Sequence, residues 1–118
     1  MVLVDTSVWV SHFREGKTNL QSLLVEGRVL CHPFVIGELA CGNLQNRKEI
    51  LSRLKSLPQT ATVQHDEVLI FIERHKLMGQ GLGYVDMHLL ASAFLSDVCF
   101  LTLDKKLNAA AHELGRAF

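Results

Sequence analysis

Several features are scarce in this chain, and their scarcity narrows its class. It has only two prolines and three cysteines among 118 residues. No two cysteines form a C-x-x-C pair, so neither a zinc ribbon nor a disulfide framework is indicated. Cys31, Cys41 and Cys99 each stand in an apolar context, and we expect all three to be buried thiols of a protein from a reducing compartment.

The chain also lacks a long hydrophobic run and an excess of charge. No apolar stretch is long enough to span a bilayer, and the apolar N-terminus is interrupted by Asp5 without the basic residues of an export signal. We therefore expect a cytoplasmic protein with no membrane segment. The 12 basic and 12 acidic residues cancel, which is not the balance of a passive nucleic-acid binder.

What the chain does contain suits one compact unit. Hydrophobic residues make up 48% of it, enough for a core without disulfides or a structural metal. No linker or low-complexity stretch divides the sequence. We therefore expect a single domain over residues 1–118.

Short apolar runs alternate with helical patterns along the chain. The runs predict strands at 2–5, 28–32 and 98–102, with a weaker candidate at 60–63. Apolar residues at helical spacing predict helices at about 6–14, 18–26, 33–42, 46–57, 65–78, 85–96 and 104–114. This alternation indicates an α/β fold with a parallel sheet that helices cover on both faces.

Four acidic residues stand where predicted strands end and helices begin. Asp5 ends the first strand, and Glu38 lies early in the helix after the second. Asp86 opens the helix before the last strand, and Asp104 follows that strand by two residues. Because function in parallel sheets collects outside the carboxyl ends of the strands, we expect the four carboxylates to converge in one cleft.

Each acid alone also has an ordinary structural interpretation. Asp86 and Asp104 stand at helix starts, where a carboxylate that caps free N–H groups contributes about 0.5–2 kcal/mol. Asp5 has the same option, and Glu38 alone is an ordinary helical glutamate. Gathered together, however, carboxylates repel: two charges about 4 Å apart cost roughly 4 kcal/mol at an effective dielectric of about 20. A divalent cation removes that cost, and oxygen-only ligands favour Mg²⁺ or Mn²⁺.

Such an ion activates water and stabilises charge on a phosphate under attack, which points to a nucleic-acid phosphodiester as substrate. Two other patterns are weaker. The glycines in residues 79–83 follow a predicted helix rather than a strand, so we expect a turn leading to Asp86 and not a dinucleotide loop. The six histidines show no metal-ligand spacing, and we expect them in packing or on the surface.

The ordered motifs resemble a known family. The relevant segments are Val4-Asp5-Thr6-Ser7-Val8-Trp9, Ile36-Gly37-Glu38-Leu39, residues 81–93 around Asp86, and Leu101-Thr102-Leu103-Asp104-Lys105-Lys106-Leu107. In order, spacing and total length they resemble the four acidic motifs of VapC-type PIN domains, the toxin half of VapBC toxin–antitoxin pairs. The resemblance covers essentially the whole chain.

The resemblance implies a PIN-like three-layer α/β/α fold with a central parallel sheet of four to five strands. It also implies Mg²⁺ or Mn²⁺ and endonucleolytic cleavage of RNA by metal-activated water. Asp5, Glu38, Asp86 and Asp104 carry over as metal ligands; Thr6, Ser7 and Thr102 carry over as hydroxyls that orient carboxylates or water. Where some relatives have a further acid, this chain has Lys105, Lys106 and Asn108, which leaves open one metal ion or two.

Partners follow from the same resemblance. VapC-type toxins form homodimers and bind an antitoxin tail in an apolar groove near the first helices, with a basic antitoxin group often reaching the acidic site. Trp9 and Phe13, one helical turn apart, therefore fit either the core or that groove. Lys105 and Lys106 fit either a solvated helix face or contacts with RNA phosphates. No aromatic-rich stripe predicts base stacking.

Two other functions stay open at this point. A catalytically silent PIN-like binding module would keep the fold without turnover. A receiver-like phosphoacceptor domain has a similar class and length, but it requires an adjacent acidic pair after the first strand, whereas Asp5 is followed by Thr6 and Ser7. It also requires an aspartate after the third strand, and 60–63 offers none before Asp66.

Overall fold

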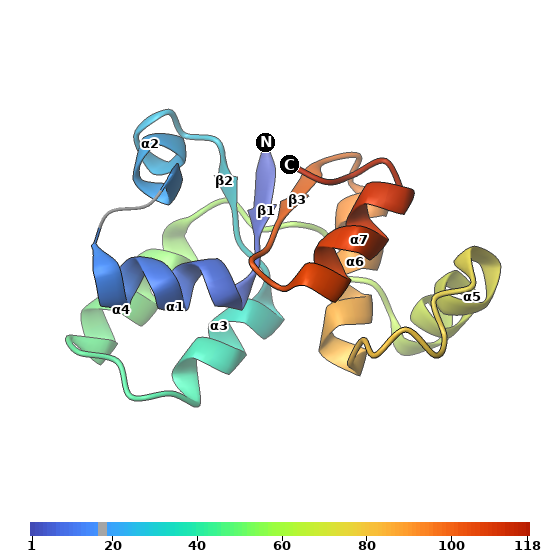
Figure 1. Ribbon diagram of the computed structural model, residues 1–118. Coiled ribbons are helices and arrows are strands. Elements are labelled where there is room, and N and C mark those ends of the chain that lie inside the picture. Colours follow the sequence, from blue (N-terminus) through green and yellow to red (C-terminus); the bar gives the residue numbers. More distant parts are fainter. Residues whose placement is uncertain (17–18) are drawn as a thin grey trace.

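The computed structural model describes residues 1–16 and 19–118 and is centred on a small parallel sheet (Figure 1). Its strands are β1 (Val2–Val4), β2 (Val29–Leu30) and β3 (Cys99–Leu101), in the order β2-β1-β3. Both neighbours of β1 run parallel to it. The parallel α/β architecture predicted from the strand–helix alternation is confirmed.

The sheet has three strands among the described residues, where four to five were expected. Residues 60–63 do not form the expected strand; the chain meets the β2 edge only in a bridge between Gln59 and Cys31. The Cys31 N–H donates to the Pro58 carbonyl, and the Thr60 N–H donates to the Cys31 carbonyl. Pro58 has no N–H with which to extend the ladder. A second bridge, between Ala117 and Phe100, widens the β3 edge in the same limited way.

Helices lie on both sides of the sheet (Figure 1). Those on the β2 side are α1 (Thr6–Glu15), α2 (Asn19–Val25), α3 (Pro33–Ala40) and α4 (Arg47–Ser56). Those on the β3 side are α5 (His65–His75), α6 (Tyr84–Leu95) and α7 (Lys105–Glu113). The described bounds agree with the predicted ones to within three residues, and residue 18, the expected start of α2, lies outside the described residues. Within that described part, no helix is both long and apolar enough to cross a bilayer.

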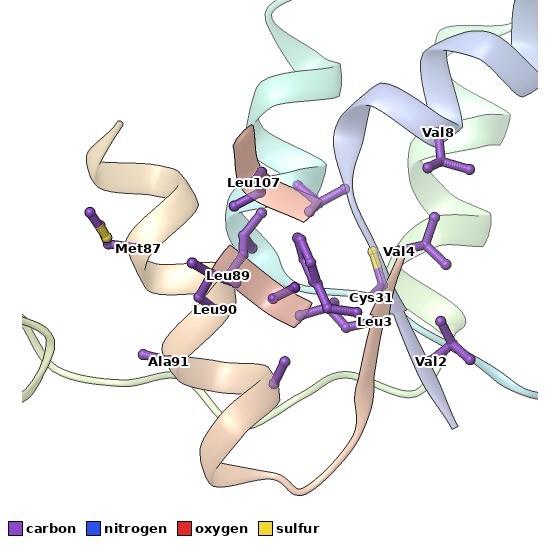
Figure 2. Packing of buried hydrophobic residues seen from close by; sticks show 14 of the residues in the cluster. Val2, Leu3, Val4, Val8, Cys31, Met87, Leu89, Leu90, Ala91 and Leu107 are labelled. Carbon is purple, nitrogen blue, oxygen red and sulfur yellow. The ribbon is translucent and has the colours of Figure 1, made fainter. Parts of the chain in front are cut away.

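The core forms where α6 packs against β1 and β3. Residues 87–93 of α6 are all buried, as expected for a helix that is apolar on every side. Figure 2 shows Leu89 and Leu90 of this helix gathered with Leu3 of β1. This packing fixes the carboxyl end of β1, and with it the position of Asp5.

The expectation of three buried thiols is right only for Cys31. Its side chain is fully buried, and burial raises the pKa of its thiol to about 11. Cys99 is partly buried and Cys41 is exposed. Cys41 follows the last residue of α3, where the chain turns away from the core, so its apolar sequence neighbours do not cover it.

Candidate active site

Asp5 lies directly after the central strand, and its side chain is only 6% exposed. The Asp5 N–H donates to the Leu101 carbonyl (2.9 Å), which holds the residue beside β3. Its Oδ2 accepts hydrogen bonds from Ser7 Oγ (2.8 Å) and Thr102 Oγ1 (2.7 Å). The side chain makes no capping hydrogen bond to α1. The capping alternative for Asp5 is therefore wrong, and two hydroxyl groups hold its carboxylate instead.

The same hydroxyls organise the chain after β3. Thr102 Oγ1 accepts from the Asp104 N–H (3.1 Å), and Ser7 Oγ accepts from the Leu103 N–H (3.1 Å). Thr102 is 7% exposed, and its hydrogen bond to Asp5 is buried. The segment that leads to Asp104 is thereby tied to the carboxylate of Asp5.

Glu38 joins this region through α1. Thr6 Oγ1, in the first turn of α1, donates to Glu38 Oε1 (2.7 Å). Glu38 lies in α3, which begins with Pro33 as its first residue, a position where the missing N–H of proline is harmless. The side chains of Thr6 and Glu38 thus connect the first turn of α1 to α3, next to Asp5.

Asp86 and Asp104 both make the capping contacts that their positions predict. Asp86 Oδ2 accepts from the Gly83 N–H (2.9 Å) just before α6. Asp104 Oδ1 accepts from the Leu107 N–H (3.0 Å) and so caps α7. A structural role is real for both residues, and it occupies one carboxylate oxygen in each.

The four acids share one feature: the described residues donate hydrogen bonds to only one oxygen of each carboxylate. Polar groups held in this half-satisfied way have capacity for a further partner. The oxygens that receive no hydrogen bond from residues 1–16 and 19–118 are Asp5 Oδ1, Glu38 Oε2, Asp86 Oδ1 and Asp104 Oδ2.

The acids also act on one another electrostatically. Burial raises the pKa of Asp86, and the charges of Asp5 and Asp104 raise it further, against the lowering effect of the Gly83 N–H. These three carboxylates therefore share one local field. They do not form a closed cage: within the described part of the chain, no three His, Cys, Asp or Glu side chains are gathered as a ready-made metal site.

We refer to Asp5, Glu38, Asp86 and Asp104 together as the acidic edge. The donor chemistry of these residues fits a hard cation. All the available atoms are carboxylate or hydroxyl oxygens, the ligands that Mg²⁺ and Mn²⁺ prefer. The buried His32 is not a competing ligand, because its Nδ1 accepts from the Phe34 N–H (2.9 Å) and its Nε2 pairs with Ser92 Oγ (3.1 Å). The histidines His32 and His88 are buried packing residues, as expected.

A contact that the sequence did not predict joins the two segments bearing Asp86 and Asp104. Gly79 and Gly81 have φ angles of 72° and 77°, which confirms the expected glycine turn before α6. A Cβ atom on Gly81 would lie 2.9 Å from Lys106 Nζ, so the Lys106 side chain of α7 lies across this turn. The sequence predicted the glycine turn but contained no signal for the approach of Lys106.

A groove borders the acidic edge on its α1 side. It has a volume of about 700 Å³, and Glu38 lines it together with Phe13 of α1, Leu44 and Ile50. Trp9, by contrast, is buried at 3% exposure. The two interpretations offered for the Trp9–Phe13 pair therefore separate: Trp9 belongs to the core and Phe13 to the groove.

Comparison with known proteins agrees with this geometry. The PIN domain family matches residues 2–113. The chain is 46% identical over 118 residues to Ribonuclease VapC32 from two strains of Mycobacterium tuberculosis, CDC 1551 / Oshkosh and ATCC 25618 / H37Rv. Each alignment covers 99% of this chain and 95% of the relative. The chain therefore belongs to the PIN-domain family and, within it, to the VapC-type ribonucleases.

Proposed function

We propose that this protein is a metal-dependent endoribonuclease, the toxin of a toxin–antitoxin pair, and that Asp5, Glu38, Asp86 and Asp104 hold Mg²⁺ or Mn²⁺. The observation that carries the proposal is that each carboxylate has one oxygen fixed by a protein donor and one oxygen without such a donor among the described residues. When bound, the ion supplies an activated water and stabilises the charge that develops on the scissile phosphate.

The roles of the protein groups follow from their contacts. Ser7 and Thr102 donate hydrogen bonds to Asp5 Oδ2. Because they hold the carboxylate in place, they also fix the orientation of Oδ1. Thr6 does the same for Glu38 through Oε1. Orientation of ligands by such outer contacts typically changes metal affinity or activity by about 10–100-fold. The three hydroxyl residues are therefore positioning residues, and the four carboxylates are the ligands.

The substrate requires positive charge as well as a metal site. Lys105 and Lys106 begin α7 directly after Asp104, and Lys106 reaches the turn that precedes Asp86. Their ammonium groups suit contacts with RNA phosphates, which are sequence-independent and weaken with salt. We assign them to substrate binding rather than to catalysis.

The groove suits an antitoxin segment. Its apolar wall favours an apolar side chain of the partner, and Glu38 on the same wall favours a basic one. A segment bound there would bring that basic group to the acidic edge and block it. A homodimer and a cytoplasmic location complete the proposal; exposed Leu69, Ile70 and Leu95 on α5 and α6 offer apolar area for a second copy.

The test is a cleavage assay on the purified chain, freed of any antitoxin. Structured RNA is incubated with Mg²⁺ or Mn²⁺, with EDTA and Asp5→Asn as controls. We expect cleavage that requires the metal and disappears in the variant, since asparagine keeps an acceptor for Ser7 and Thr102 but loses the charge. Cleavage that persists in Asp5→Asn contradicts the proposal.

The same assay separates the remaining alternative. A wild-type protein that binds Mn²⁺ normally but cuts no RNA is a catalytically silent PIN-like binding module. The receiver-like interpretation is already replaced, because the chain belongs to the PIN-domain family.

A further inference from the structure

A cluster of aromatic rings lies at the surface beside the acidic edge. Phe34, in the first turn of α3, and Tyr84, the first residue of α6, are 40% and 45% exposed. Both contact the buried ring of His88, with centroid distances of 4.7 Å from Phe34 and 4.6 Å from Tyr84. Residues 50 positions apart in sequence thus present two exposed rings on one shared support.

The two rings are held in place by polar contacts behind and beside them. His65, at the start of α5, pairs through Nδ1 with the Tyr84 hydroxyl (2.5 Å). His32 is fully buried, lies 5.3 Å from the Phe34 ring and accepts from the Phe34 N–H. Because these rings are already fixed, they lose little side-chain entropy when a flat ligand stacks on them.

The cluster adjoins Glu38, one of the proposed metal ligands. Phe34 precedes Glu38 by four residues, about one helical turn, so the two side chains lie on the same face of α3. Tyr84 precedes Asp86 by only two residues and so faces a different side of α6; its link to this region is the contact that it shares with Phe34, the ring of His88. The rings are therefore within reach of a nucleotide whose phosphate lies at the acidic edge.

We propose that Phe34 and Tyr84 form a stacking platform for a nucleobase next to the scissile phosphate. This inference rests on the proposed function, because it takes RNA as the substrate. Stacking on aromatic side chains tolerates any base, so the platform positions the strand without selecting its sequence. It supplies the base contact that no stripe in the sequence predicts.

A second copy of the chain is the less suitable occupant. Stable protein interfaces bury about 800 Å² on each partner, whereas the platform consists of two rings with a hydroxyl and imidazoles among them. The exposed aliphatic residues that would suit a copy lie elsewhere: Leu95 ends α6 at the opposite end from Tyr84. The mixture of rings and polar groups favours a nucleobase.

The test combines protein variants with modified RNA. Phe34→Leu and Tyr84→Leu remove a ring but keep apolar bulk, Tyr84→Phe keeps the ring, and Phe118→Leu is the matched control. Phe118 is equally exposed, at 50%, but lies at the C-terminus beside Arg28. The probe is a short single-stranded RNA of mixed sequence, together with versions that carry an abasic nucleotide at each position in turn.

We expect each leucine variant to raise KM with little change in kcat and to weaken RNA binding by roughly 5- to 150-fold. Phe118→Leu should retain wild-type affinity, and Tyr84→Phe, which keeps the ring but loses the hydrogen bond to His65, should lose less affinity than Tyr84→Leu. One abasic position should weaken binding to the wild type by a similar factor but have little further effect on the leucine variants, because the base and the ring form one contact. Mn²⁺ binding should not change.

The outcomes distinguish this inference from the proposed function. If the wild type cuts RNA, but the leucine variants bind it as tightly as the wild type does and no abasic substitution weakens binding, the platform is overturned and the nuclease stands. If the variants change only the oligomeric state, measured by light scattering, the rings belong to an interface between copies and the platform is overturned. If RNA binds in EDTA with the predicted base dependence but is never cut with metal, the platform stands and the nuclease is overturned.

Discussion

Two polar regions of this protein, the fully buried His32 and the partly exposed acidic edge, treat their polar groups in opposite ways. At His32, both ring nitrogens have partners, the Phe34 N–H and Ser92 Oγ. At the acidic edge, each carboxylate has one oxygen held by described residues and one that they leave available. A buried polar group with all its hydrogen bonds made stabilises a fold, whereas a buried group with an unused oxygen, such as Asp5, costs stability unless another partner binds. The comparison separates a structural polar site from the one that we propose binds a metal ion.

The largest expected effect concerns the satisfied site. Burial, with a smaller contribution from the neighbouring His88, lowers the pKa of His32 from the usual 6.5 to about 4. Below pH 6.5 His32 is protonated in the unfolded chain but stays neutral in the folded protein. The contribution of the neutral ring to the free energy of unfolding is therefore fully present above pH 6.5 and is lost as the pH falls toward 4. The total is about 3 kcal/mol.

Chemical denaturation across this pH range measures the effect. His32→Asn keeps an acceptor for the Phe34 N–H at a helix start that favours asparagine, and it cannot titrate. Its stability should therefore show a shallower pH dependence than that of the wild type. Equal pH dependence in the two proteins would contradict the assignment of His32 as a buried neutral group.

The next effect concerns the orientation of Asp5. Thr102→Val replaces the hydroxyl that donates to Asp5 Oδ2 with a methyl group of similar size. We expect metal affinity or cleavage to fall by roughly 10–100-fold. Thr60→Val is the matched control, because Thr60 is equally buried but bonds to the Cys31 carbonyl beyond β2. Similar kinetics for both variants would show that Thr102 does not position Asp5.

The available oxygens should also carry a cost to stability. Burial and the neighbouring charges raise the pKa of Asp86 above its usual 3.8, so its charged form is disfavoured in the folded protein. Asp86→Asn, which retains an acceptor for the Gly83 N–H, should raise the free energy of unfolding near neutral pH. The gain should vanish below pH 3.8, where the aspartate is protonated in both states.

Asp66→Asn provides the comparison, since Asp66 is an exposed acid in the first turn of α5. Measured without metal, only the Asp86 variant should become more stable. Asp86→Ala should leave the metal-free protein as stable as the wild type or more so; a loss of more than about 2 kcal/mol would mean that capping is the main role of Asp86.

The smallest expected effect is on salt dependence. Lys106→Met should weaken RNA binding for all sequences alike and reduce the slope of log affinity against log salt by about 0.7 for a single strand. Lys55→Met, in the last turn of α4, should leave the slope unchanged. Equal slopes for the wild type and Lys106→Met would remove Lys106 from the substrate contacts.

Sequence periodicity predicted most of the helices well because local spacing defines them, as in α5, where the buried Val68 and Phe71 stand three residues apart. The strand predicted at 60–63 does not form. Its β-branched residues indicate strand propensity but do not supply a pairing partner, and Pro58 limits the ladder. The prediction of a buried Cys41 was wrong because it also relied on local sequence alone. Apolar sequence neighbours do not determine where a helix leaves the core.

The acidic edge was predictable in its members but not in its contacts. Positions near predicted strand ends and in the helices that follow or precede them suggested the four acids as ligands, and that assignment stays a prediction. The hydrogen bond between Thr102 and Asp5 spans 97 residues, and the meeting of Phe34 with His88 joins two separate helices. Such contacts depend on how the layers pack, which local patterns do not encode.

The central claim is that the oxygens left available at the acidic edge bind a divalent ion. The most direct test is a titration of the purified protein with Mn²⁺, followed by electron paramagnetic resonance, alongside Asp5→Asn with its folding verified by circular dichroism. We expect saturable binding by the wild type and a large loss of affinity in the folded variant. Equal binding by both proteins, or no saturable binding by the wild type, would contradict the account.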